Sequence, residues 1–297
     1  MQEGSIAMHL STPLMALLVV VVLAVFYMTA CRREVSEDQL FFPRRIPVVD
    51  AIEGRQNVSI EASDGETIRG WYYYDAGRSK TVIYAYGNGE TVFDSQYRLT
   101  WLVDHLDVNV LAIDYRGYGF SDGSPSIDDL RQDILTVYDY LVRDLGGADQ
   151  SVYAFGRSIG TAAALHLASE RDLDGLVLEA PFTTITDVIR SWNQQLAVPV
   201  RWLVRLRPAA HLVEIRPQPV EAIAGFEHEV LIIHGTRDEV IPIELGRSMY
   251  EATTSAEKTW CPVEGAGHND LLLSHPDVAR ELQSFFGTAK EPPSPRA

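Results

Sequence analysis

The chain has 297 residues, of which 46% are hydrophobic, so it is long enough to bury one sizeable core. Its 41 Asp and Glu residues outnumber its 25 Lys and Arg residues, which gives a formal net charge of −16. This charge opposes binding to nucleic acid and to anionic lipid headgroups. The two cysteines, Cys31 and Cys261, lie in unlike contexts, so the sequence indicates neither a disulfide framework nor a cysteine metal site.

An apolar segment near the amino terminus, residues 14–30, contains 17 uncharged residues, which is the lower limit for a helix that spans a bilayer. We predict that residues 1–33 are a membrane anchor. The alternatives are a secretory signal ending in "MTAC", with a lipoprotein acylated at Cys31, and a buried core helix. Arg32 and Arg33 follow the segment and would keep the main domain on the cytoplasmic side, whereas a lipoprotein would be exported. The side of the membrane therefore stays open.

Residues 34–55 carry scattered charge and proline without periodicity, which predicts a linker. Two alternating runs around Asp64 and Gly65 then predict a β-hairpin. From residue 80 onward, short apolar runs alternate with helical patterns, so residues 56–288 are predicted to form one α/β domain. Its fold would be a mostly parallel twisted sheet with helices on both faces. The tail, residues 289–297, is predicted to be disordered.

One segment interrupts this alternation. Residues 183–225 contain amphipathic pieces, four prolines and a local excess of arginine. We predict a small helical cap over the strand ends, with a peripheral pair of helices as the alternative.

A serine stands between an apolar strand pattern and an alanine-rich helical pattern, in the sequence "GRSIG". So sharp a strand-to-helix turn needs small residues on both sides, here Gly156 and Gly160. The Ser158 hydroxyl would project beside a helix amino terminus, where unpaired N–H groups favour a developing negative charge. Ser158 is therefore the candidate nucleophile, and an ordinary glycine-rich turn is the alternative.

A serine nucleophile needs a base, and the candidate is His268 in "EGAGHND". It follows the last predicted strand on a glycine-rich loop that can reach the sheet edge where Ser158 lies. His166 lies eight residues further along the Ser158 helix, roughly 12 Å by helical rise, so it is predicted to be a packing residue. His234 ends a strand and is given a structural role.

The base in turn needs a carboxylate that fixes its tautomer and stabilises the imidazolium. Asp238 follows the predicted strand "EVLIIHG", and its competitors are Glu239, Glu264 and Asp270. A serine, an aspartate and a histidine in this order, each after a strand, form a strong joint signal.

Acyl transfer also requires fixed donors for the oxyanion. The backbone N–H of Ile159, directly after the serine, is one candidate. The other is the backbone N–H of Asn88, in the turn "GNG" after an earlier strand, for which an ordinary turn residue is the alternative.

Six motifs occur in the order found in one family, and their sequences are "YGNGET" (86–91), "DYRGYGFSDG" (114–123), "GRSIGTAAA" (156–164), "EAPFTT" (179–184), "HGTRDEVIP" (234–242) and "GAGHND" (265–270). Residues 57–286 thus resemble the α/β-hydrolase fold superfamily and, more narrowly, the Bem46-like serine hydrolases. The resemblance implies Ser158 as nucleophile, His268 as base and Asp238 as acid, with backbone donors at Asn88 and Ile159. One position departs from the family, because Tyr86 stands where such proteins usually have histidine. Many members carry an amino-terminal hydrophobic anchor.

These residues predict two-step acyl transfer that requires no metal or organic cofactor. The expected substrate is an ester, a thioester or a lipid-acyl group, and the membrane is the expected second partner. A serine peptidase or amidase of the same fold is one alternative. A membrane-tethered binding module without catalysis is the other.

Overall fold

The computed structural model describes residues 17, 19–21, 32–46, 54–198, 200 and 204–288. The predicted tail and most of the predicted anchor lie outside these residues. Within the described ranges, no helix is long and apolar enough to cross a membrane.

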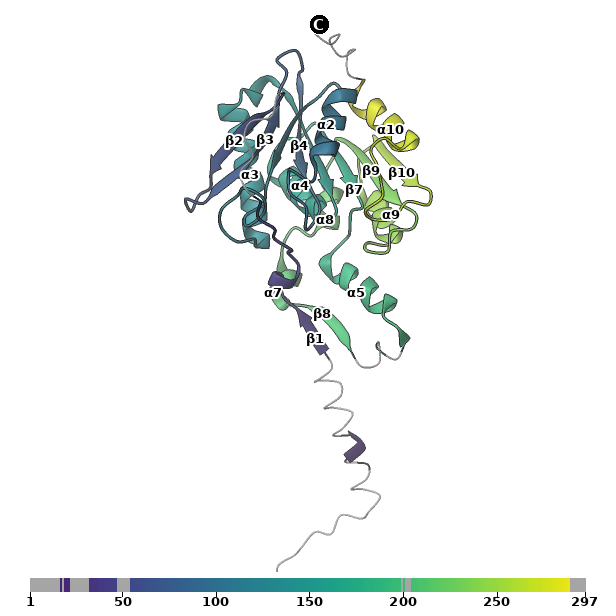
Figure 1. The fold of residues 1–297 in the computed structure, drawn as a ribbon. Coiled ribbons are helices and arrows are strands. Elements are labelled where there is room, and N and C mark those ends of the chain that lie inside the picture. Colours follow the sequence, from purple (N-terminus) through teal and green to yellow (C-terminus); the bar gives the residue numbers. More distant parts are fainter. Residues whose placement is uncertain are drawn as a thin grey trace, which may run out of the picture.

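An eight-stranded sheet lies at the centre of the molecule, in the strand order β10-β9-β7-β6-β4-β5-β3-β2 (Figure 1). β3 pairs antiparallel with β2 and β5, and the other neighbours are parallel. The strands are β2 (Gln56–Glu61), β3 (Thr67–Tyr73), β4 (Lys80–Ala85), β5 (Asn109–Ile113), β6 (Ser151–Arg157), β7 (Gly175–Glu179), β9 (Glu229–Gly235) and β10 (Lys258–Val263).

The buried parallel strands and the β-hairpin predicted from the sequence are confirmed. Every residue of β5 and β7 is buried, as expected for parallel strands that are covered on both faces. β2 and β3 form the predicted hairpin, with Ile60 opposite Ile68 and Gly65 at a φ of 88° in the turn.

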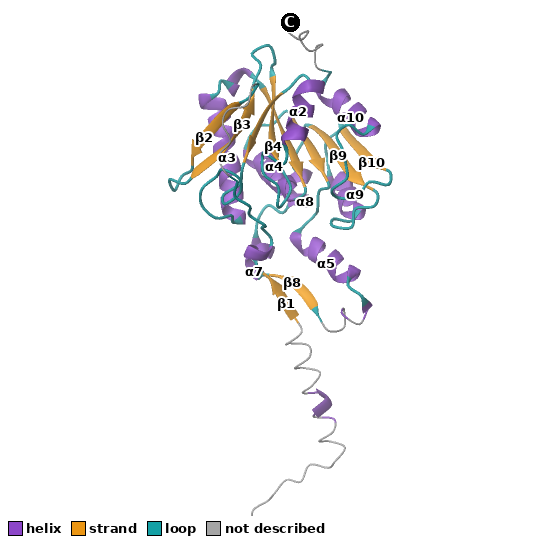
Figure 2. Ribbon diagram, viewed as in Figure 1, coloured by secondary structure: helices purple, strands orange, loops and turns teal. Residues whose placement is uncertain are grey.

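Helices cover both faces of the sheet (Figure 2). Helices α3, α4, α8 and α9 pack side by side in one layer, whereas α2 and α10 lie on the opposite face. The helices are α2 (Gln96–His105), α3 (Ile127–Asp144), α4 (Ile159–Glu170), α5 (Ile185–Gln195), α7 (Ala210–Glu214), α8 (Pro219–Ala224), α9 (Ile243–Ala252) and α10 (Pro276–Phe286), with short 3-10 turns η1 (Glu37–Gln39) and η2 (Gly147–Asp149).

Residues 183–225, here called the cap segment, leave the sheet after β7 and return to it at β9. The segment carries α5, β8 (Arg205–Pro208), α7 and α8. β8 pairs in parallel with β1 (Arg32–Val35) in a separate two-stranded sheet that the sequence did not predict.

The predicted linker, residues 34–55, needs correction, because its first part belongs to the folded body. Leu40 and Phe41 are buried, and Arg45 forms a β-bridge to Gly119. Leu40 and Phe41 follow neither a helical nor a strand period, so the sequence pattern predicts a loop. Contacts with distant parts of the chain nevertheless hold this segment in place.

The sheet topology determines where a ligand can bind. β5 lies on one side of β4 and β6 lies on the other, so the connections after β4 and β6 leave in different directions. In open α/β sheets, ligands bind at the carboxyl ends of the strands beside such a switch point.

Candidate active site

Ser158 occupies a strained turn between β6 and α4, with a φ of 54° and a ψ of −120°. A Cβ atom at Gly156 would lie 2.5 Å from the Gly160 carbonyl oxygen, and one at Gly160 would lie 2.1 Å from the Ala85 carbonyl oxygen. Both glycines are therefore sterically required, as the motif predicts. The Ser158 backbone N–H donates to the Glu179 carbonyl oxygen at 2.9 Å, which holds the turn against β7.

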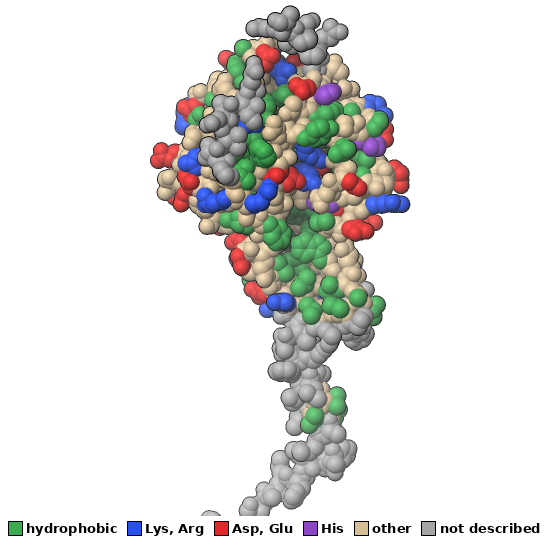
Figure 3. Space-filling view, viewed as in Figure 1, with side chains coloured by type: hydrophobic (Ala, Val, Ile, Leu, Met, Phe, Trp, Pro, Cys, Tyr) green, Lys and Arg blue, Asp and Glu red, His purple; other side chains and the backbone are tan. Residues whose placement is uncertain are grey.

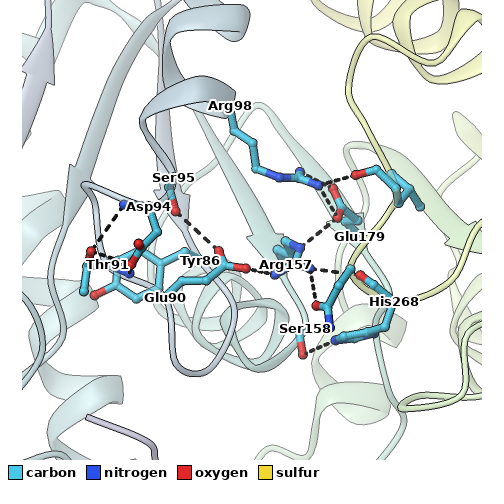
Figure 4. Close-up of polar contacts among 12 residues, drawn as sticks. Tyr86, Glu90, Thr91, Asp94, Ser95, Arg98, Arg157, Ser158, Glu179 and His268 are labelled. Atoms are coloured by element: carbon cyan, nitrogen blue, oxygen red, sulfur yellow. Dashed lines mark hydrogen bonds and ion pairs between the residues drawn. The ribbon is translucent and has the colours of Figure 1, made fainter. Parts of the chain in front are cut away.

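The structure brings Ser158, His268 and Asp238 together from the ends of β6, β10 and β9. His268 Nε2 lies 3.0 Å from Ser158 Oγ (Figure 4). His268 Nδ1 lies 2.7 Å from Asp238 Oδ2. With Nδ1–H donating to the carboxylate, Nε2 is free to accept the serine proton. The arrangement is a nucleophile, a base and an orienting acid in one hydrogen-bonded chain.

Asp238 is almost fully buried and fully hydrogen-bonded. Its Oδ1 accepts from the backbone N–H groups of Val240 at 2.9 Å and Ile241 at 2.8 Å. His234 Nε2 lies 3.5 Å from Asp238 Oδ2. The histidine for which the sequence predicts a structural role therefore contacts the orienting carboxylate. Burial raises the pKa of Asp238, but the hydrogen bonds from His234 and His268 outweigh burial and hold it well below its usual range. The carboxylate therefore stays charged.

The competing carboxylates are placed elsewhere. Glu239 and Glu264 are exposed, and Asp270 accepts a hydrogen bond from the Gly267 backbone N–H.

The two predicted oxyanion donors line the same cavity as Ser158. A Cβ atom at Gly87 would lie 3.5 Å from Ser158 Cβ, so the turn after β4 touches the serine. The Asn88 side chain is held by two hydrogen bonds: its Oδ1 accepts from Tyr118 Oη at 2.7 Å, and its Nδ2 donates to the Leu40 carbonyl oxygen at 2.6 Å. Among the described residues, the backbone N–H groups of Asn88 and Ile159 have no hydrogen-bond partner, so both are available to an oxyanion.

Tyr86 supports this turn from inside the core. Its hydroxyl donates to Asp114 Oδ1 at 3.1 Å and accepts from the Tyr115 backbone N–H at 2.9 Å. The Tyr86 carbonyl oxygen in turn accepts from the Tyr115 hydroxyl at 2.8 Å. Burial raises the pKa of Asp114 to about 6. A buried tyrosine network thus fixes the loop at the position where the resembled family usually has histidine.

A mostly apolar cavity of about 370 Å³ opens beside Ser158. One stripe of α4 lines it, formed by Ile159, Ala162, Ala163 and His166 at helical spacing. His166, predicted to be a packing residue, is therefore a cavity residue. In the space-filling view, hydrophobic side chains gather over the cap segment next to the sheet domain (Figure 3). The cap segment and its approach contribute Phe182, Ile185, Val188, Trp192, Leu212, Ile215, Pro217, Gln218, Pro219 and Ala222 to the wall.

The end of the cavity remote from Ser158 is polar. Arg131 Nη2 donates to His166 Nδ1 at 3.2 Å and to the Arg216 carbonyl oxygen at 2.5 Å. Burial, followed by the nearby charge of Arg131, lowers the pKa of His166 to about 4, so this imidazole is neutral at pH 7.

Sequence reasoning missed Arg157, which precedes the candidate nucleophile. Its side chain is 5% exposed, and its Nε donates to Glu179 Oε1 at 3.0 Å. The sequence signal is an arginine at the end of a mostly apolar strand pattern, where a buried charge requires a partner. No group of three or more His, Cys, Asp or Glu side chains in the described ranges could hold a metal ion.

Comparisons with known proteins show which sequences this chain resembles. The family described as "Serine aminopeptidase, S33" matches residues 78–220. The alpha/beta hydrolase domain-containing protein aho-3 of Caenorhabditis elegans is 34% identical over 210 residues, which cover 69% of this chain and 57% of that protein. An uncharacterized protein of Mycobacterium tuberculosis is 31% identical over 240 residues, which cover 79% of this chain and 80% of that protein. The match thus spans less than two thirds of the nematode relative.

A solved structure has the same fold at low sequence identity. The Pyrococcus furiosus esterase Pf2001 superposes with a TM-score of 0.64 at 20% identity, covering 82% of this chain and 99% of that one. The family match and the fold together define a hydrolase of the α/β type. The chain belongs to the α/β-hydrolase superfamily.

Proposed function

We propose that the protein is a serine hydrolase that cleaves esters, thioesters or lipid-acyl groups through an acyl-enzyme on Ser158. The observation that carries this proposal is the hydrogen-bonded chain from Ser158 through His268 to Asp238, at one end of an apolar cavity.

In the proposed reaction, His268 Nε2 takes the hydroxyl proton as Ser158 Oγ attacks the substrate carbonyl carbon. The backbone N–H groups of Asn88 and Ile159 stabilise the oxyanion. His268 then protonates the leaving group, which departs and leaves the acyl group on Ser158. Water, activated by the same imidazole, releases the acid. Asp238 stays ionised throughout and stabilises the imidazolium.

The shape of the cavity supports an acyl chain of limited length. From Ile159 to His166, the α4 stripe runs about 10 Å, the length of an extended chain of roughly eight carbons. Beyond this point, a longer chain would bring apolar carbons against the Arg131 guanidinium and the His166 ring. We therefore propose medium-length acyl groups as the preferred substrates.

The description of the matched family favours a second candidate, an aminopeptidase. An aminopeptidase must bind a positively charged substrate amino group, for which a carboxylate is the natural partner. The described residues that line the cavity include no Asp or Glu, which favours the acyl hydrolase.

A substrate panel tests the proposal. We expect p-nitrophenyl octanoate to be cleaved faster than the acetate and palmitate esters, and a fluorophosphonate probe to label the enzyme. Faster cleavage of aminoacyl p-nitroanilides than of any acyl ester would support the peptidase. A folded protein that neither labels nor turns over any of these substrates would support a non-catalytic binding module.

We further propose that residues 14–30 attach the protein to a membrane, either as a single anchor or through a lipoprotein acylated at Cys31. The support is the length and apolar character of the segment. Fractionation of the full chain and of a chain that begins at Arg32 tests this attachment. Recovery of the full chain without detergent would contradict it. A Cys31→Ser variant separates the two modes, because only the lipoprotein would lose its attachment.

A further inference from the structure

A buried ion-pair network lies next to the candidate active site (Figure 4). Arg98 forms two hydrogen bonds to Glu179, of 2.7 and 2.8 Å, and Arg157 Nε donates to the same carboxylate at 3.0 Å. Arg157 also pairs with Glu90. The Glu179 side chain is 1% exposed, so the two guanidinium groups compensate a fully buried charge.

Both arginines of this network also hold the loop that carries His268. Arg157 Nη2 donates to the His268 carbonyl oxygen at 2.9 Å and to Asn269 Oδ1 at 3.0 Å. Arg98 Nη2 donates to the Leu271 carbonyl oxygen at 2.6 Å. Three hydrogen bonds from buried arginines therefore converge on residues 268–271.

These contacts matter because the loop has little support of its own. Residues 268–271 belong to no helix or strand, and Asn269 and Asp270 are exposed. In the part of the chain that the structure describes, these four residues form no backbone–backbone hydrogen bond outside regular elements. The position of His268 therefore depends on side-chain contacts of its loop, which are the burial of Leu271, the Gly267–Asp270 hydrogen bond and the hydrogen bonds from the two arginines.

The network also connects this loop directly to the nucleophile. Arg157 is the residue before Ser158, at the end of β6, and it lies opposite Glu179 in the β6–β7 ladder. The Ser158 backbone N–H is bound to the Glu179 carbonyl oxygen. The serine turn and the histidine loop thus share one rigid strand pair as their support.

We propose that Arg157 and Arg98, oriented by Glu179, are positioning residues that hold His268 Nε2 within hydrogen-bond distance of Ser158 Oγ. This inference rests on the proposed function, in which His268 is the base. A displacement of about 1 Å at a reacting group can lower the rate on the order of 100-fold, so a loosened loop should be visible in kcat.

The variant Arg157→Lys tests the proposal. A lysine ammonium cannot bind Glu179, the His268 carbonyl and Asn269 with the fork geometry of a guanidinium. We expect kcat for p-nitrophenyl octanoate to fall about 10- to 100-fold with KM changed less than about threefold. We also expect the low-field proton NMR signal of the His268 Nδ1–H that donates to Asp238 to weaken or shift. Asn269→Ala, at an exposed position, should give a smaller loss of kcat in the same direction.

A matched control is Arg116→Lys. Arg116 is similarly buried and binds Asp133 through two hydrogen bonds of 2.8 and 2.9 Å, but it does not contact the His268 loop. This variant should lower the melting temperature and leave kcat and the His268 signal unchanged.

Unchanged kcat and an unchanged His268 signal in Arg157→Lys would overturn the proposal, as would an equal loss of kcat in Arg116→Lys. If Arg157→Lys does not fold, the same two measurements on Asn269→Ala decide, and no effect there would refute the positioning role. Failure of the proposed function gives a different result. In that case the wild-type protein turns over no ester, while the His268 signal still reports whether the arginines hold the loop.

Discussion

The close approach of α4 to the end of β4 makes Gly160→Ala a sharp test of the proposed site. In the native structure, a Cβ atom at position 160 would lie 2.1 Å from the Ala85 carbonyl oxygen and 2.7 Å from the Tyr86 carbonyl oxygen. Both are backbone atoms of the sheet, so neither can move aside as a flexible side chain would.

The required displacement can be estimated from these distances. Ordinary contact begins at 3.4 Å, so α4 and the end of β4 must separate by about 1.3 Å. Overpacking of this kind costs about 1–3 kcal/mol of unfolding free energy. The same movement separates the N–H of Ile159 from that of Asn88, which should lower kcat on the order of 100-fold.

Thermal unfolding and the kinetics of p-nitrophenyl octanoate hydrolysis measure the two effects. The control is Gly225→Ala, because a Cβ atom there would meet only the Ala222 carbonyl oxygen, at 3.7 Å, and its φ is −94°. The control should stay within about 0.5 kcal/mol of wild type with unchanged kcat. A folded Gly160→Ala protein with a kcat within twofold of wild type would refute the assignment of these two backbone donors.

Four further predictions concern single residues. Ser158→Ala should abolish fluorophosphonate labelling and lower kcat by a factor on the order of 10⁴ or more while the protein still folds; full labelling would move the nucleophile elsewhere. Asp238→Asn should lower kcat on the order of 10⁴-fold on the same ester, and a loss below tenfold would contradict its orienting role. Ala162→Leu narrows the cavity and should reduce the ratio of octanoate to acetate hydrolysis at least about tenfold, whereas an unchanged ratio would place the acyl chain elsewhere. Burial raises the pKa of Asp114 from 3.8 to about 6, so this residue contributes stability at low pH that is lost as the pH rises through 6. Denaturant unfolding should therefore show Asp114→Asn gaining up to about 3 kcal/mol relative to wild type between about pH 4 and about pH 7, and a constant difference would contradict the raised pKa.

The main sheet and the chain of polar residues at its edge could be predicted from local patterns. The strands of the main sheet from β4 to β10 are apolar runs, and the turn at Ser158 carries its own steric signature in Gly156 and Gly160. Asp238 and His268 follow because parallel strands end at one edge of the sheet.

Other features depend on contacts between distant segments and could not be predicted. β1 and β8 are short and charged, with the sequences "RREV" and "RLRP", and each forms a strand only because the other lies beside it. Leu40 and Phe41 are buried without any period in the sequence. The distance of His166 from Ser158 along the helix predicts a packing residue. The same distance places His166 at the far end of the cavity.

The ion-pair network around Arg157 could be identified only from the pairing register of the sheet. Its partner Glu179 lies 22 residues further along the chain and meets Arg157 because β6 and β7 are paired at that position. The sequence shows two charges near strand ends, but only the ladder shows that they share one buried site.

The parallel pairing of β1 with β8 has a mechanical consequence. The two strands run in the same direction from Arg32 beside Arg205 to Val35 beside Pro208, and the chain continues from β1 into Gln39 and Leu40, which line the cavity. A force that pulls on the amino-terminal end of β1 therefore acts along the strand and loads its pairing with β8 in shear. Tension applied there would reach the cavity wall, through Gln39 and Leu40, before it reaches the eight-stranded sheet.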